Sequence, residues 1–204
     1  MKVAASSVNG FGLGTVAGYL HGMMEHRFPL IRARTPPAPS RQSVRVSRAQ
    51  YVAVPAAIGI AHRPDGVLVR DAGALGLAGT AAFGGVALLG PLEGRTVLIS
   101  GATGGVGAIA VRLAAARGAR VIATAMSGSE SGFVSALTDA EVTVIDYTQD
   151  VTAQVRAIAP DGVDAVLHLA GDLAELTALT RDGGAVASAL TVPEASETAS
   201  CRPP

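Results

Sequence analysis

The sequence predicts an α/β fold built on a doubly wound parallel sheet. From Arg95 onward, short β-branched runs recur about 20 to 25 residues apart, the repeat of a strand plus a helix. The segments between these runs carry apolar residues at helical spacing. Strands that alternate with helices pair in parallel and are covered on both faces. With 204 residues, 49% of them hydrophobic, the chain can bury such a core, and intrinsic disorder is excluded.

The elements can be placed in order along this part of the chain. The strands are expected to open at Thr96, Val121, Val142, Val163 and Ala185. A glycine at position 118 is a typical stop for the first helix. The apolar faces of the helices are, in turn, Val106, Ile109, Ala110 and Leu113, then Val151, Val155 and Ile158, and then Leu173, Leu176 and Leu179.

The strand that opens at Thr96 runs directly into a glycine-rich turn at residues 101–107 and then into a helix. A dinucleotide pyrophosphate needs this arrangement. Gly101 permits the tight turn, Gly104 lets the backbone approach the phosphates, and Gly107 lets the helix pack closely on its strand. The helix N-terminus offers free N–H groups and a positive dipole end to the anion. Because a strand precedes the turn and four more follow it, dinucleotide binding is favoured over a purely structural turn.

The form of the dinucleotide depends on the end of the second strand. An NAD site places Asp or Glu there, about 20 residues past the first glycine, to bind the ribose 2′-hydroxyl. This chain has no acid between Arg117 and Glu130, and the serines at 127 and 129 are able to donate to a 2′-phosphate. The sequence therefore favours NADPH, although it offers no arginine or lysine clamp at this position.

The first 94 residues contain short apolar runs separated by turn signals, as in part of a β-rich domain. Residues 31–48 hold five arginines and three prolines without an acid. Nucleic-acid binding is not expected, because sixteen basic and sixteen acidic side chains cancel and no recognition motif accompanies the run.

Residues 72–92 are uncharged and long enough to cross a bilayer. Their six glycines and the proline near their end favour a buried small-residue helix and its connection instead. No membrane attachment is expected. The single cysteine, Cys201, fits a reducing compartment, so a soluble, cytoplasmic protein is expected.

Two dehydrogenase families use such a glycine turn. The short-chain family also needs a tyrosine with a lysine four residues later, and Lys2 is the only lysine in the chain. Short-chain chemistry is therefore rejected. Seven stretches of the chain are similar to motifs of the second family and occur in the same order: residues 4–10, 26–30, 50–55, 72–79, 101–107, 144–147 and 162–166.

By these stretches the chain resembles the medium-chain dehydrogenase/reductase superfamily, in its zinc-independent quinone oxidoreductase branch. The resemblance implies a Rossmann domain at residues 95–191, preceded by an incomplete GroES-like β-domain at residues 1–94 and followed by an irregular tail at residues 192–204. The active site of the family lies in the cleft between the two domains.

The resemblance also implies roles for single residues. Asn9 would line the substrate cleft near the nicotinamide, as the catalytic residue of the site. Tyr147 has two open interpretations, a cofactor contact or an aromatic side chain packed at a strand end. The expected cofactor residues are Thr103, Gly104, Gly105 and Val106 at the pyrophosphate and nicotinamide, Ser127 and Tyr147 by the adenosine phosphate, and Ala170 and Gly171 along the backbone after the fourth strand.

A zinc site is not expected. Zinc-dependent relatives need a cysteine and a histidine at the metal, whereas Cys201 stands alone. His21 and His26 are five residues apart and would diverge around a helix. The resemblance then implies direct hydride transfer from NADPH to a quinone or a conjugated carbonyl compound (an enone), which is the expected small-molecule partner.

The chain departs from the family in three places. It lacks the opening strands, residues 31–48 replace a glycine-rich stretch, and the sixth strand of the Rossmann sheet is missing, as if residues 31–48 and 192–204 came from frameshifts. The alternatives to an active reductase are therefore a remnant that binds nucleotide without turnover and a non-functional product. The family pairs its sixth strands to form a homodimer, so heterogeneous association is expected here instead.

Overall fold

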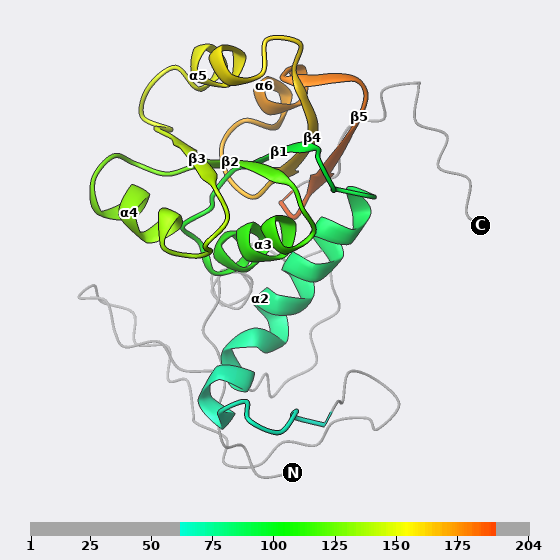
Figure 1. Cartoon of the computed structure of the whole chain (residues 1–204), viewed down its shortest axis with the longest axis vertical. Helices are drawn as coiled ribbons and strands as arrows, with labels where there is room; N and C mark the ends of the chain where they lie inside the picture. Colours follow the sequence, from blue (N-terminus) through cyan, green and yellow to red (C-terminus); the bar gives the residue numbers. More distant parts are fainter. Residues whose placement is uncertain (1–61, 191–204) are drawn as a thin grey trace, which may run out of the picture. The chain divides into compact units, whose positions relative to one another are not determined.

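The computed structural model describes residues 62–190 (Figure 1). The chain forms two compact units, Met1–Thr80 and Ala81–Pro204, and their boundary falls within helix α2 (Val69–Leu88). The predicted domain boundary at residue 94 stays a prediction.

Several predictions fall outside the described residues. They are residues 1–61 of the GroES-like domain, with the arginine-rich segment 31–48 and the cleft residue Asn9, and the tail 192–204.

The second unit contains the predicted parallel sheet. It has five strands in the order β3-β2-β1-β4-β5, and each neighbouring pair is parallel. All four residues of β1 are buried, as expected for the central strand of a sheet covered on both faces. The strands are β1 (Thr96–Ile99), β2 (Arg120–Thr124), β3 (Val142–Ile145), β4 (Val163–His168) and β5 (Thr180–Ser188).

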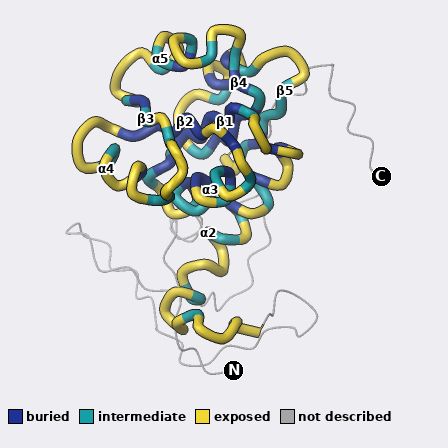
Figure 2. The backbone as a smooth tube through the Cα atoms, viewed as in Figure 1, coloured by how far each residue is buried: buried dark blue, intermediate teal, exposed yellow. Residues whose placement is uncertain are grey.

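Helices cover both faces of this sheet, because alternate strand residues point to opposite sides. Val97 and Ile99 belong to one apolar cluster, which includes residues of α3 and α4, whereas Leu98 belongs to a second cluster with α5 and α6. Figure 1 shows α5 and α6 above the sheet and α3 and α4 below it, and Figure 2 shows the buried residues between these layers. The doubly wound prediction is confirmed. The helices are α3 (Gly105–Ala116), α4 (Ser129–Ser135), α5 (Val151–Ile158) and α6 (Leu173–Ala178).

The start of β5 corrects one predicted boundary, since the strand begins at Thr180 rather than at Ala185. The glycines at 183 and 184 look like a turn in the sequence, but they form an irregularity inside the strand. Thr180 pairs with Val163 and Ala185 with Ala165, with a register shift between the two pairs. Such a bulge re-aims a strand without ending it.

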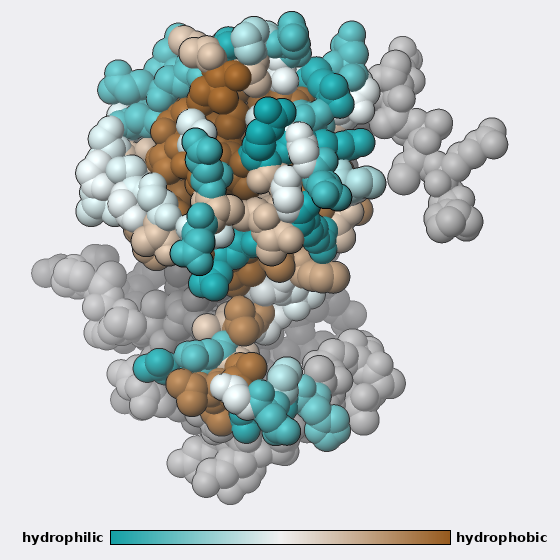
Figure 3. Space-filling view, viewed as in Figure 1, coloured by the Kyte–Doolittle hydropathy of each residue, from teal (hydrophilic) through white to brown (hydrophobic). Residues whose placement is uncertain are grey.

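The prediction of a buried helix at residues 72–92 is also corrected in part. The predicted helix exists, and among the described residues it is long and apolar enough to cross a membrane by length and composition. Only Ala82 and Val86 within it are buried, in the core of the second unit. Apolar side chains such as Leu75 and Phe83 are exposed, and brown side chains show along α2 in Figure 3. The expectation of a soluble, cytoplasmic protein stays a prediction.

Candidate functional site

The turn between β1 and α3 has the geometry that the sequence predicts. Gly101 has φ +68°, a conformation that side chains with a Cβ rarely adopt. A Cβ on Gly107 would lie 2.1 Å from the carbonyl oxygen of Gly101 and 2.7 Å from Cα of Ala102. The first turn of α3 therefore rests directly on the backbone of the loop that precedes it, and both positions require glycine.

The start of α3 has no side-chain cap. Its N-cap is Gly104, with φ −73° and ψ 164°. By contrast, Asp150 accepts a hydrogen bond from the backbone N–H of Ala153 at 2.8 Å at the start of α5, and Asp172 caps α6 in the same way. The first N–H groups of a helix have no partner within the helix, and they carry the positive end of its dipole. The uncapped start of α3 is therefore suited to an anion.

Space is available in front of this helix start. Gly104 is exposed, and a Cβ on it would have one neighbour within 4 Å, the carbonyl oxygen of Gly101 at 3.3 Å. Gly105, the first residue of α3, is exposed too. A ligand group can thus reach the backbone where a side chain would stand in its way.

A cavity of about 330 Å³ lies beside the turn, at the carboxyl ends of the strands. This is the edge of an open α/β sheet at which ligands bind. Five of the predicted cofactor residues line it together: Gly101, Thr103, Tyr147, Ala170 and Gly171. Its other lining residues are Ser100, Thr124, Val151, Asp172, Glu175 and Leu176.

Three polar side chains at the strand ends form hydrogen bonds with the backbone around this cavity. They were not among the site residues predicted from the sequence. The hydroxyl of Thr124, at the end of β2, accepts a hydrogen bond from Gly101 N at 2.9 Å. The hydroxyl of Ser100 accepts from Leu169 N at 3.0 Å and from Ala170 N at 3.3 Å. A signal for both was present, because each is a polar residue that directly follows an apolar strand run.

The third is His168, which is buried at the end of β4. Its Nε2 lies 3.1 Å from the carbonyl oxygen of Gly171, and its Nδ1 lies 2.9 Å from Ser188 Oγ. Since a carbonyl oxygen only accepts, Nε2 carries the proton. The imidazole therefore ties the loop after β4, where Ala170 and Gly171 lie, to the end of β5.

Ser127 lies at a different part of this edge, the β2–β3 corner, which we define as Ser127, Glu130, Asp146, Tyr147 and Thr148. Asp146 accepts hydrogen bonds from the backbone N–H of Ser127 at 3.1 Å and from its hydroxyl. It also accepts from the backbone N–H of Thr148 at 2.8 Å and from its hydroxyl at 2.7 Å. These bonds, with the Ser127 hydroxyl first, hold the pKa of Asp146 far below its usual range, so the group is a carboxylate.

A second carboxylate reaches the same corner. Glu130 accepts a hydrogen bond from the backbone N–H of Met126 at 2.9 Å. Partial burial raises the pKa of Tyr147, and the charge of Glu130 and a hydrogen bond to it raise that pKa further. The Tyr147 hydroxyl is therefore a donor to Glu130, and the residue, which is 48% exposed, lines the cavity. The Tyr147 side chain is therefore not buried against the sheet at the strand end.

The described residues contain no group of three or more histidine, cysteine or acidic side chains that could hold a metal ion. The histidines of the first unit and Cys201 lie outside them, with the exception of His62. The absence of zinc stays a prediction.

Comparison with known proteins indicates the family. A family model described as zinc-binding dehydrogenase matches residues 105–200. Bovine (Bos taurus) prostaglandin reductase-3 is 34% identical over 126 residues, which are 61% of this chain and 32% of that protein. Emericella nidulans alcohol dehydrogenase 1 is 35% identical over 104 residues, 50% of this chain and 29% of that protein. Residues 105–200 therefore match the zinc-binding dehydrogenase family, and the chain is similar to members of the medium-chain dehydrogenase/reductase superfamily.

Solved structures of this superfamily share the fold. An NAD-dependent alcohol dehydrogenase matches with a TM-score of 0.61 and 33% identity, over 69% of this chain and 41% of that one. The quinone oxidoreductase of Thermus thermophilus, whose structures include a complex with NADPH, matches with a TM-score of 0.54 and 28% identity, over 64% of this chain and 43% of that one. The chain spans about a third of the length of the curated relatives above.

Proposed function

We propose that this protein is an oxidoreductase of the superfamily that uses a nicotinamide dinucleotide to reduce a quinone or a conjugated carbonyl compound without zinc. The uncapped start of α3, above a glycine turn and beside a cavity at the carboxyl edge of the sheet, is the observation that carries the proposal. A bound nicotinamide would supply the hydride.

The residues present fit such a cofactor. The backbone N–H groups of Gly105 and Val106 would bind the pyrophosphate, and Gly107 keeps the helix start close to the turn. The N–H of Gly104 donates to the Gly101 carbonyl oxygen at 3.1 Å, so Gly104 contributes its lack of a side chain instead. Ser100 and His168 hold the loop of Ala170 and Gly171 in place beside the cavity. Apart from the cofactor, the work of these groups is to bind and orient.

The substrate class and the independence from zinc come from the resemblance to the quinone oxidoreductase branch. The solved quinone oxidoreductase of Thermus thermophilus supports this class. Asn9 is proposed to line the substrate cleft. Quinones and enones suit a site without a Lewis acid, because hydrogen-bond donors and water can satisfy the developing oxyanion.

The two solved relatives are described with different nicotinamide cofactors, NAD for the alcohol dehydrogenase and NADPH for the Thermus protein. The sequence favours NADPH because residues 118–129 contain no acid. The end of β2 is only part of this region, because the β2–β3 corner also holds the carboxylates of Glu130 and Asp146. The proposed function therefore requires a nicotinamide dinucleotide, with or without the 2′-phosphate.

Oxidation of NADPH and of NADH by 1,4-benzoquinone, followed at 340 nm, tests the proposal in the presence and absence of EDTA. Turnover that survives EDTA supports it. Binding of either dinucleotide in a calorimetric titration, without turnover, supports the alternative of a nucleotide-binding remnant. The absence of both binding and turnover indicates a non-functional product.

A further inference from the structure

We propose that Asp146 makes this site select NADH over NADPH. It accepts the hydrogen bonds of the Ser127 and Thr148 donors, which are then not available to a phosphate, and it places a fixed negative charge at the β2–β3 corner. This inference rests on the proposed function, because it concerns the cofactor of the same site. It reverses the preference expected from the end of β2 alone.

The corner is where the adenosine ribose is expected. In a dinucleotide-binding α/β fold, the residues after the second strand face the ribose that carries, in NADPH, the 2′-phosphate. In this sheet Thr124 of β2 pairs with Ile145 of β3, so the residues that follow the two strands lie side by side. Ser127 and Asp146 meet there through two hydrogen bonds.

A 2′-phosphate would find the donors of Ser127 and Thr148 already engaged. The Ser127 hydroxyl has one proton, and it points to Asp146. The Thr148 hydroxyl and the backbone N–H groups of Ser127 and Thr148 also donate to Asp146, and the N–H of Met126 donates to Glu130. What the hydroxyls of Ser127 and Thr148 still offer outward are lone pairs, which suit a ribose 2′-hydroxyl and not a phosphate.

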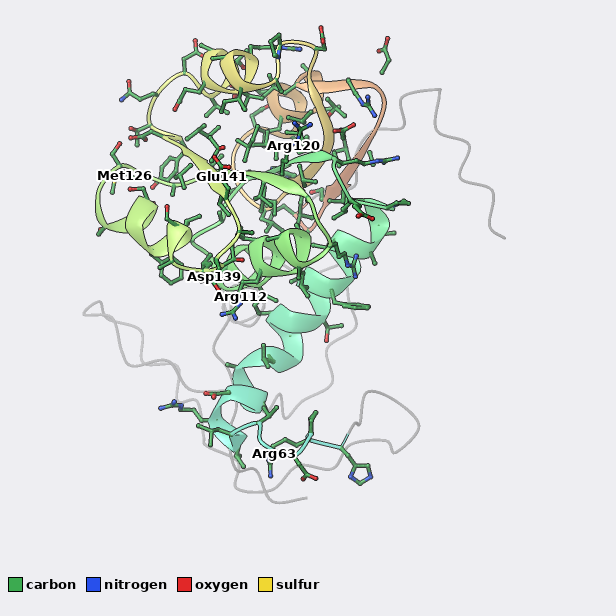
Figure 4. The ribbon with its side chains drawn as sticks, in the orientation of Figure 1. Arg63, Arg112, Arg120, Met126, Asp139 and Glu141 are labelled. Carbon is green, nitrogen blue, oxygen red and sulfur yellow. The ribbon has the colours of Figure 1, made fainter. Side chains whose placement is uncertain are left out.

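The charges of the corner also oppose the binding of a 2′-phosphate. The two carboxylates and a 2′-phosphate have the same sign, and like charges placed together oppose binding. Among residues 62–190 the ion pairs are Arg70–Asp71 and Arg181–Asp164, so neither carboxylate of the corner is neutralised by one. Figure 4 places Met126, the neighbour of Ser127, apart from the labelled Arg112 and Arg120.

The variant Asp146→Asn tests the charge. We expect the unmodified chain to bind NADH more tightly than NADPH in calorimetric titrations. We expect Asp146→Asn to raise the NADPH-to-NADH affinity ratio about tenfold, the order expected for one charge removed near a phosphate in water-like surroundings, and less at 0.5 M salt. Asp161→Asn is the matched control, because Asp161 is an exposed acid that precedes β4, at the opposite end of the strands. It should leave the ratio unchanged.

The variant Ser127→Ala tests the role of the Ser127 hydroxyl. Unlike Asp146→Asn, it introduces no carboxamide whose packing could affect the result. If Asp146 holds the Ser127 hydroxyl as an acceptor for the ribose, Ser127→Ala weakens NADH by about two- to tenfold, the size of one hydrogen bond, and leaves NADPH unchanged. If Ser127 instead donates to a 2′-phosphate, NADPH is weakened and NADH is not, and the inference is wrong.

The other outcomes are equally decisive. Tighter binding of NADPH by the unmodified chain, or an unchanged ratio in an Asp146→Asn chain that is folded by far-UV circular dichroism, overturns the inference and leaves the proposed function standing. Binding of neither dinucleotide overturns both.

Discussion

The close contact beneath α3 gives a sharp test of the glycine turn, through the substitution Gly107→Ala. The new Cβ would lie 2.1 Å from the Gly101 carbonyl oxygen, 2.7 Å from Ala102 Cα and 2.8 Å from Gly101 C. All three neighbours are backbone atoms, so no side chain can rotate away and the turn or the helix has to move. Overpacking of this kind costs about 3 kcal/mol or more.

One favourable effect opposes the strain. Alanine is about 1 kcal/mol better than glycine inside a helix, so the net loss of unfolding free energy is about 2 kcal/mol or more. For a unit of this size, about 4 °C of melting temperature corresponds to 1 kcal/mol. We therefore expect the melting temperature, followed by far-UV circular dichroism, to fall by about 8 °C or more. Dinucleotide binding should be lost as well, because the turn is displaced.

Gly132→Ala is the matched control for this substitution. Gly132 is also a helical glycine, in α4, and a Cβ on it would meet nothing within 4 Å. The same gain in helix propensity should then act alone and raise the melting temperature by up to about 4 °C. A Gly107→Ala chain that melts with or above the unmodified protein would refute the close packing of α3 on its turn.

Three further predictions follow from the same structure. Gly104→Val should abolish dinucleotide binding in a calorimetric titration, with far-UV circular dichroism as the check on folding because a Cβ there lies 3.3 Å from the Gly101 carbonyl oxygen; normal binding would remove the pyrophosphate from this turn. Because hydrogen bonds lower the folded-state pKa of Asp146, its stabilisation is present above the unfolded pKa of about 4 and is lost as the pH falls below it. The melting-temperature difference between the unmodified chain and Asp146→Asn should thus be larger at pH 7 than at pH 3, and an equal difference would contradict the assignment. Since β5 is an edge strand of the described sheet, light scattering should show heterogeneous association, whereas a monodisperse dimer would contradict that expectation.

The parts of the fold that could be predicted from the sequence are those determined by local pattern. The strand openings at Thr96, Val142 and Val163 agree with the structure, because a buried parallel strand needs a continuous apolar run. The start of β5 could not be predicted in this way. Its bulge depends on how Thr180 and Ala185 pair with the neighbouring strand, and the glycines between them have the same appearance in a turn.

The candidate site divides along the same line. The glycine turn could be predicted, because the backbone conformation of Gly101 and the contact of Gly107 depend on residues within seven positions of each other. The acidity of the β2–β3 corner could not be read from the residues after β2 alone. Asp146 is 19 residues from Ser127 in the sequence and becomes its neighbour only through the pairing of β2 with β3.

This difference follows from how the two halves of a dinucleotide would be recognised. Phosphates are bound by backbone N–H groups at the start of a helix, so the glycines that expose the backbone are visible in the sequence. The ribose is distinguished by the direction of single protons, and that direction depends on which acceptor already holds each hydroxyl. Ser127 counts as a donor when it is considered alone and as an acceptor once Asp146 is beside it. Cofactor selectivity in this chain is therefore a property of the sheet register, which brings two strand ends together, and not of the residues after β2 alone.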